Sequence, residues 1–126
     1  MLFTNEIGII GSGRLGICLA LSLEQKGFNI LCTDINTYML DTIKNKTLIS
    51  SEQYVNEMLI KSKNIKTTYN NHDIFEKQLI FIVVATPSLI DGSYNHSAIE
   101  EVVNNIEIYY STKKNLIKNI LLFVLL

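Results

Sequence analysis

The feature that most constrains the fold is a glycine motif placed between a strand-like and a helix-like segment. The motif is Gly11-Ser12-Gly13-Arg14-Leu15-Gly16, and it directly follows the β-branched run of residues 6–10. Residues 14–26 have the length and the leucine, alanine and isoleucine content of a helix. A strand, a tight turn and a helix in this order predict the first part of a βαβ unit.

The second strand of that unit is predicted at residues 28–34. Gly27 precedes it and can adopt the positive φ that commonly ends a helix. The strand ends on Asp34, which lies 18 residues after Gly16. A glycine triplet alone also occurs in ordinary turns. A carboxylate near this spacing, however, indicates a dinucleotide site, because it can bind the ribose hydroxyls.

The three glycines have separate roles in such a site. The first permits the turn, the second lets a pyrophosphate approach, and the third lets the helix pack on the strand. Backbone N–H groups at the start of the helix then face the anion. The carboxylate of Asp34 repels the extra phosphate of NADP, and Ile35 and Asn36 follow it where an arginine would neutralise that phosphate. The sequence therefore predicts NAD as the cofactor.

The remaining pattern predicts an α/β fold. We expect a Rossmann-type parallel sheet that is flanked by helices and is incomplete relative to a full dinucleotide-binding fold. Residues 79–85 are apolar throughout, as expected for a strand in the middle of the sheet. A loop with the only proline, Pro87, follows at residues 86–95. Asn36 and Ser97 are predicted helix caps. The other expected elements are helices at residues 37–44, 52–61 and 98–110 and strands at residues 65–68 and 119–126.

Composition bounds the class of protein. The 126 residues suffice for one domain, and a formal charge of -1 leaves no basic stripe for nucleic acid or an anionic membrane. The last apolar run is too short to span a bilayer, and the amino terminus lacks the pattern of a signal peptide. Cys18 and Cys32 lie in apolar runs, and His72 and His96 lie in polar ones. We therefore expect buried thiols, solvated loop histidines, no metal site and a cytoplasmic protein.

Two sequence blocks together resemble the UDP-glucose and GDP-mannose dehydrogenase family. The first is the glycine motif with Asp34-Ile35-Asn36, and the second, more specific block is Ala85-Thr86-Pro87-Ser88-Leu89-Ile90-Asp91-Gly92. The resemblance covers residues 6–103 and leaves residues 115–126 as a divergent tail. It implies that NAD is bound by Gly11, Ser12, Gly13, Arg14, Leu15, Gly16, Asp34 and Thr86. The alternative for Thr86-Pro87 is a plain strand terminator.

The chain departs from the family pattern at several places. Residues 52–59 resemble the family's Glu-Pro-Gly-Leu segment, but Gln53 and Tyr54 stand where proline and glycine are usual. Met39 occupies a place where a lysine or arginine near the adenosine ribose is common, and we expect this departure to weaken NAD binding. Gln78 replaces an acidic residue before the fourth strand.

Members of the family oxidise the C6 alcohol of a nucleotide sugar to a carboxylate, using NAD and a cysteine, a lysine, an asparagine and an aspartate from later segments. Cys18 and Cys32 fall inside the dinucleotide motif, so no catalytic residue is assigned. The family's next landmark, Lys-Ser-Thr-Val-Pro, should begin near residues 115–118, where this chain continues with an apolar run. We hypothesise that a frameshift near Lys118 replaced that motif and shortened the chain.

Three functions are open on the sequence alone. The first is a truncated nucleotide-sugar dehydrogenase that binds NAD and binds a nucleotide sugar only when missing segments complete it. The second is a stand-alone dinucleotide-binding regulatory module that needs a partner chain. The third places the chain nearer to hydroxyacid or hydroxyacyl dehydrogenases, which share the glycine motif and the aspartate. Because the fold alone does not determine a substrate, the choice depends on other residues, and the loop with Thr86-Pro87 and Asp91-Gly92 argues against this function.

Overall fold

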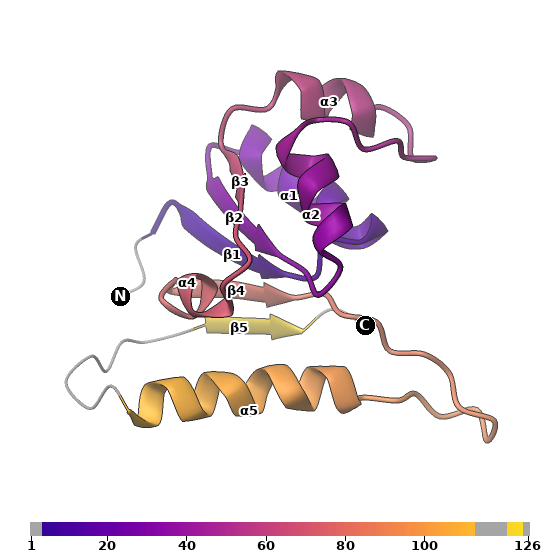
Figure 1. Ribbon diagram of the computed structural model, residues 1–126, viewed down its shortest axis with the longest axis vertical. Helices are drawn as coiled ribbons and strands as arrows, with labels where there is room; N and C mark the ends of the chain where they lie inside the picture. The colour runs from indigo at the N-terminus through magenta and orange to yellow at the C-terminus, as the bar shows by residue number, and fades with distance from the viewer. Residues whose placement is uncertain (1–3, 113–120, 125–126) are drawn as a thin grey trace.

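The computed structural model describes residues 4–112 and 121–124. Within them, five parallel strands form one sheet in the order β3-β2-β1-β4-β5, and helices cover both faces of it (Figure 1). The predicted Rossmann-type arrangement is therefore confirmed. The strands are β1 (Glu6–Ile10), β2 (Asn29–Thr33), β3 (Ile65–Thr67), β4 (Leu79–Ile82) and β5 (Leu121–Val124). The helices are α1 (Arg14–Gln25), α2 (Thr37–Lys44), α3 (Val55–Lys61), α4 (Asn71–Phe75) and α5 (Ser97–Ser111).

The central strand β1 sends its side chains alternately into two apolar cores. Ile7 and Ile9 pack with Ala20 of α1 on one face, and Ile10 packs with Phe75 of α4 on the other face. On the first face, α1 also packs with α2 and α3 in a further apolar cluster. Burial on both faces explains why the central strands are apolar along their length instead of alternating with polar residues.

The short helix α4 packs closely on β1 because β1 has a glycine at the contact. A Cβ atom on Gly8 would lie only 2.8 Å from Cγ2 of Ile74. A larger residue would therefore push α4 away from the sheet. The sequence pattern did not predict α4. Asn70 caps this helix by accepting the backbone N–H of His72 at 3.0 Å.

The predicted elements are confirmed with shifts at some ends. The structure gives β1 and α2 their predicted bounds, and Asn36 caps α2 by accepting the N–H of Met39 at 3.1 Å. The structure ends β4 at Ile82 instead of residue 85. On the side of β1, the ladder ends with the pair Ile10 and Ile82, and the N–H of Val83 makes the last hydrogen bond, to the carbonyl oxygen of Ile10.

Three predicted details are corrected. The predicted helix at residues 52–61 begins only at Val55, because Tyr54 has a φ of +70°, outside the helical region. Ser97 is not a cap but the first residue of α5, and Asn95 accepts its N–H at 2.9 Å. His72 lies in α4 and not in a loop, although it is exposed. Its ring contacts that of Tyr109 of α5 in a tilted arrangement, with ring centroids 4.9 Å apart and an interplanar angle of 48°.

The carboxyl-terminal predictions are only partly within the described residues. The expected strand at residues 119–126 is present as β5 at Leu121–Val124. The predicted frameshift near Lys118 and the expected family landmark at residues 115–118 lie outside the described residues. None of the helices formed by residues 4–112 has the length and hydropathy needed to cross a bilayer.

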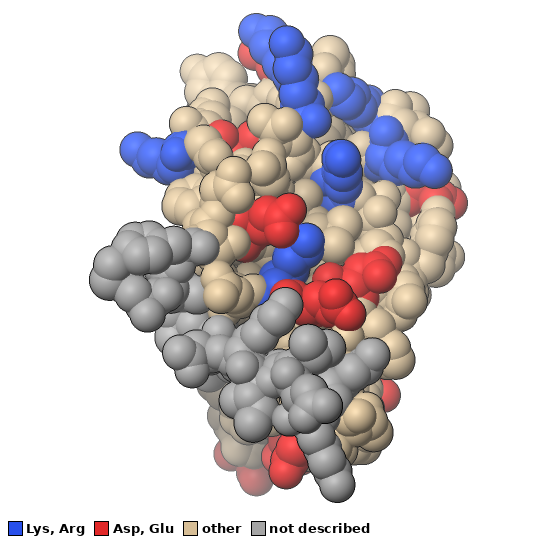
Figure 2. All heavy atoms as spheres, turned by 90° about the vertical axis from the view of Figure 1, so that its left-hand side faces the viewer, with Lys and Arg blue, Asp and Glu red and all other residues tan. Residues whose placement is uncertain are grey.

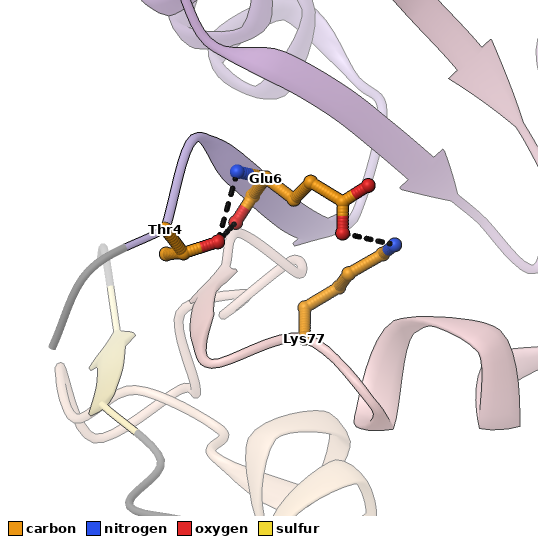
Figure 3. A network of polar contacts seen from close by, with 3 residues as sticks. All are labelled: Thr4, Glu6 and Lys77. Atoms are coloured by element: carbon orange, nitrogen blue, oxygen red, sulfur yellow. Dashed lines mark hydrogen bonds and ion pairs between the residues drawn. The ribbon is translucent and has the colours of Figure 1, made fainter.

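The edge of the sheet where the strands begin carries charges of both signs. Lys and Arg side chains gather over the upper part of this side, with Asp and Glu side chains among them (Figure 2). At this edge Lys77, between α4 and β4, donates to Oε2 of Glu6 at 3.2 Å (Figure 3). The hydroxyl of Thr4 donates to the carbonyl oxygen of Glu6 and accepts its N–H. The glycine motif lies at the opposite edge, where the strands end.

Candidate cofactor site

The first and third glycines of the motif are required by close backbone packing. Gly11 has a φ of +103°, a conformation that side chains with a Cβ rarely adopt. A Cβ there would overlap the carbonyl oxygen of Val83, just after β4. A Cβ on Gly16 would overlap the carbonyl oxygen of Gly11, so α1 lies directly against the turn. These two positions shape the loop and bring α1 to the end of β1.

The second glycine, Gly13, has open space where its side chain would be. A Cβ on Gly13 would meet no atom within 4 Å. Gly13 is the N-cap of α1, no side chain caps the helix there, and the first turn contains no acidic residue. The first N–H groups of the helix therefore have no acidic or capping side chain in their own turn, and the helix dipole favours an anion beside them. This space and these donors fit a diphosphate.

Asp34 connects the glycine loop to the end of β2. Its Oδ2 accepts the N–H of Ser12 at 2.6 Å, and its Oδ1 accepts the N–H of Asn36 at 2.8 Å. The backbone N–H of Gly11 and the hydroxyl of Ser12 both donate to the carbonyl oxygen of Thr33. A carboxylate can accept about four hydrogen bonds. Asp34 therefore retains acceptor capacity for a ribose hydroxyl while it holds the loop.

Two motif residues, Arg14 and Leu15, point into solvent at the start of α1. Half of Leu15 is exposed. The Nε atom of Arg14 contacts Oε1 of Glu52, which lies in the segment before α3. The sequence interpretation included Arg14 as part of the motif but did not predict its partner. The two residues are 38 positions apart, and no local pattern indicates their contact.

The loop that contains Thr86 follows β4 at the same edge of the sheet. Thr86 lies three residues after Val83, the residue that Gly11 packs against, and it is half-buried. The loop bonds mainly to itself: the N–H of Asn95 donates to the carbonyl oxygen of Pro87 at 2.8 Å, and Ser88 pairs with Tyr94 in an antiparallel bridge. The structure therefore brings Thr86 to the edge where the glycine loop lies.

The turn of this loop is held by an aspartate and a glycine. The carboxylate of Asp91 accepts the hydroxyl of Ser93 at 2.6 Å and the N–H of Ser93 at 3.0 Å. The side-chain bond first, and the backbone bond second, lower the pKa of Asp91. Gly92 has a φ of +88°, which explains the glycine of the Asp-Gly pair.

The two cysteines are free, and their environments differ. Cys32 on β2 is buried, as predicted, and burial raises the pKa of its thiol to about 12. Cys18 on α1 is only partly buried. Burial first, and the nearby Glu52 carboxylate second, raise the pKa of Cys18, while Arg14 lowers it. Neither thiol has the low pKa of a reactive nucleophile.

Comparison with known proteins identifies the family of this chain. Residues 5–120 match the family described as the UDP-glucose/GDP-mannose dehydrogenase family, NAD binding domain. The chain belongs to this family. The resemblance found in the two sequence blocks is thereby confirmed, and the alternative assignment to hydroxyacid or hydroxyacyl dehydrogenases is rejected. As a member of this family, the chain is an NAD-binding domain, and the predicted cofactor is confirmed.

Relatives of the UDP-glucose/GDP-mannose dehydrogenase family are longer than this chain. It is 28% identical over 106 residues to UDP-glucose 6-dehydrogenase YwqF of Bacillus subtilis, covering 80% of this chain and 24% of that protein. The chain therefore spans about a quarter of the length of the UDP-glucose 6-dehydrogenases it matches.

Two solved structures share the fold. GDP-mannose dehydrogenase of Pseudomonas aeruginosa, in a ternary complex, has a TM-score of 0.73 at 24% identity, over 79% of this chain and 24% of that chain. UDP-D-ManNAc dehydrogenase of Pyrococcus horikoshii has a TM-score of 0.77 at 18% identity, over 94% of this chain and 28% of that chain.

The departure from the family at Tyr54 falls at a backbone position that favours glycine. Tyr54 adopts a left-handed backbone conformation, with a φ of +70° and a ψ of -6°. Glycine adopts this conformation readily, and glycine is usual at this place in the UDP-glucose/GDP-mannose dehydrogenase family. The backbone at Tyr54 supports the alignment of residues 52–59 with the Glu-Pro-Gly-Leu segment, although this chain has a tyrosine at the glycine position.

Proposed function

We propose that the glycine loop, Gly11 to Gly16, binds NAD together with Asp34 and Thr86, and that the chain is the cofactor domain of a nucleotide-sugar dehydrogenase. The observation that carries the proposal is the open space at Gly13, beside helix N–H groups that no side chain caps. That space lies next to a carboxylate with spare acceptor capacity at the end of β2.

Each part of the site has a separate task in this proposal. The N–H groups of the first turn of α1 bind the diphosphate, and Gly13 leaves room for it. Asp34 accepts the ribose hydroxyls and keeps the loop in place through Ser12. Thr86 contacts the cofactor from the loop after β4, as it does by resemblance in the family. The bound cofactor supplies the hydride acceptor for oxidation of an alcohol.

The same geometry favours NAD over NADP. Asp34 and Glu52 are both negative, and Arg14 of the loop already contacts Glu52. The additional phosphate of NADP carries about -1.5 to -2 charges, and a carboxylate at the ribose position repels it. We therefore expect clear discrimination against NADP.

The substrate class follows from the family. We propose a nucleotide sugar whose C6 alcohol is oxidised to a carboxylate, with UDP-glucose as the leading candidate, because the Bacillus subtilis relative is a UDP-glucose 6-dehydrogenase. We assign no catalytic residue within the 126 residues. Turnover therefore requires that a further segment or a partner chain supply the nucleophile and the sugar-binding residues. We also propose the cytoplasm as the compartment, because Cys18 and Cys32 are both free thiols.

Calorimetric titration of the full chain with NAD and NADP tests the proposal. We expect binding of NAD and at least about tenfold weaker binding of NADP, which corresponds to about 1.4 kcal/mol. Asp34→Asn should weaken NAD binding and reduce the discrimination. Glu101→Gln on α5, which removes an exposed carboxylate far along the chain from the site, is the charge-matched control and should change neither. Absence of heat with both ligands at millimolar concentration would refute the proposal.

A further inference from the structure

The contact between Arg14 and Glu52 joins the cofactor loop to a segment that is distant in sequence. Arg14 is the first residue of α1, at the helix end where the proposed diphosphate binds. Its side chain is 75% exposed, and that of Glu52 is 33% exposed. The guanidinium uses its Nε donor for Glu52. An arginine has five N–H donors, so four remain for other acceptors.

Glu52 is held in its position from both sides. Its backbone N–H donates to the hydroxyl of Ser50 at 3.1 Å, and the N–H of Ser50 donates to Oδ1 of Asn56 at 2.9 Å. Three residues further on, Val55 is buried in the apolar cluster that includes Ile17 of α1. The placement of the carboxylate beside Arg14 therefore follows from local hydrogen bonds and core packing, in addition to the attraction between the two charges.

The pair determines how much positive charge the loop presents to a ligand. Arg14 carries the only positive charge among residues 11–16, and Asp34 is the carboxylate that the loop contacts directly. With Glu52 in place, the charge of Arg14 is largely compensated, and Asp34 leaves the edge negative. Without Glu52, Arg14 would be unpaired next to a helix end that already favours anions. The gain in binding energy would then increase with the negative charge of the ligand.

We propose that Glu52 is a positioning residue that limits, through Arg14, the negative charge that the glycine loop accepts. Glu52 thus acts with Asp34 to favour NAD over more highly charged dinucleotides. The proposal rests on the proposed NAD-binding function and assigns to it a second determinant of cofactor specificity, outside the glycine motif and outside β2.

Calorimetric titration of four forms of the full chain tests this assignment: the unaltered chain, Glu52→Gln, Arg14→Gln and the double variant. In about 50 mM salt, Glu52→Gln should tighten NADP binding by about three- to fivefold and NAD binding by less than about twofold. Arg14→Gln should weaken both. In the Arg14→Gln background, the further change Glu52→Gln should alter NADP binding clearly less than it does in the unaltered chain. The tightening should also decrease at about 0.5 M salt, because screening shortens the reach of the charge.

A matched control separates the pair from the net charge of the chain. Glu57→Gln removes an exposed carboxylate from α3, five residues after Glu52, and should leave the ratio of the NADP and NAD dissociation constants unchanged. Thermal melting of each variant checks that the fold is retained. If the unaltered chain binds NAD and Glu52→Gln leaves the ratio unchanged or weakens NADP, the inference fails and the NAD function stands. If the unaltered chain binds neither ligand, the proposed function fails, and the inference fails with it.

Discussion

The two loops at the cofactor edge are built in different ways. The glycine loop after β1 is shaped by the surrounding fold: Gly11 abuts Val83, Gly16 abuts Gly11, and Asp34 holds the loop from the neighbouring strand. The loop after β4 is shaped by its own hydrogen bonds, and Ile90 at its tip is fully exposed. A Cβ at Gly11 or Gly16 must therefore disturb the surrounding backbone, whereas a change in the second loop can remain local.

The largest effect is expected at the third glycine. Gly16→Ala should destabilise the chain by about 3 kcal/mol or more, because its Cβ would overlap the backbone of Gly11. Gly13→Ala is the matched control and should cost about 1 kcal/mol or less, because its Cβ meets open space. Urea unfolding followed by circular dichroism measures both. Equal losses for the two variants would remove the distinction between packing and ligand-facing glycines.

The next effect concerns the attachment of α5, which follows the second loop. The hydroxyl of Tyr109 donates to the Glu76 carboxylate, and this bond is the main reason that the pKa of Tyr109 is raised to about 12. Tyr109→Phe should lower the free energy of unfolding by about 1 kcal/mol at pH 8. Tyr38→Phe on α2, where the side chain is mostly exposed, should have little effect.

The same bond predicts a pH dependence with a definite sign. Because the folded protein holds the Tyr109 proton more tightly than the unfolded chain, the stabilisation is complete below pH 10 and decreases between pH 10 and 12. Unfolding measured at pH 9 and pH 11 should show a smaller decrease for Tyr109→Phe than for the unaltered chain. An identical decrease in both proteins would show that this hydrogen bond does not contribute to the pH dependence.

A smaller effect of opposite sign is expected at Tyr54, where a left-handed backbone lacks a glycine. Tyr54→Gly should raise the free energy of unfolding by about 0.5 to 1 kcal/mol, because relief of the strained backbone exceeds the entropic cost of glycine. Tyr38→Gly, in a helical conformation at a similarly exposed position, should instead lower it by about 1 kcal/mol. Thermal melts of both variants test the sign. A destabilised Tyr54→Gly variant would mean that the Tyr54 side chain contributes more than its backbone costs.

The smallest effect is expected at the tip of the second loop. Ile90→Ser should change the free energy of unfolding by no more than about 0.5 kcal/mol, because the side chain is fully exposed. Ile74→Ser in α4, which is fully buried, should cost several times more. Similar losses at both positions would show that the second loop also depends on the core.

The sequence predicted most accurately those parts of the fold in which a local signal and the tertiary contact coincide. The glycine motif predicted β1, the turn and the start of α1, because its first and third glycines are required by the close packing of the turn against β4 and α1. Asn36 predicted the start of α2 because a cap acts within three residues. The start of α3 was misplaced, since nothing in the residue type of Tyr54 indicates a positive φ.

The parts that were missed depend on contacts between distant residues. The helix α4 is only five residues long, and two of them, Ile74 and Phe75, make it stable by entering the core. Gly8 is needed for α4 to pack on the sheet. In the sequence, however, a glycine inside a strand indicates only a less stable strand and does not predict a helix packed against it. The contact between Arg14 and Glu52 has no periodic signal at all, so only the folded chain shows it.

The double attachment of Asp34 has a kinetic consequence. Its carboxylate already fixes Ser12 and Asn36 before any ligand arrives, and it still has free lone pairs. At Asp34, neither of these hydrogen bonds has to be broken before a ribose can bind. Association of the dinucleotide should therefore proceed in a single phase without a slow rearrangement, and variants of this edge should differ chiefly in how long the bound ligand stays.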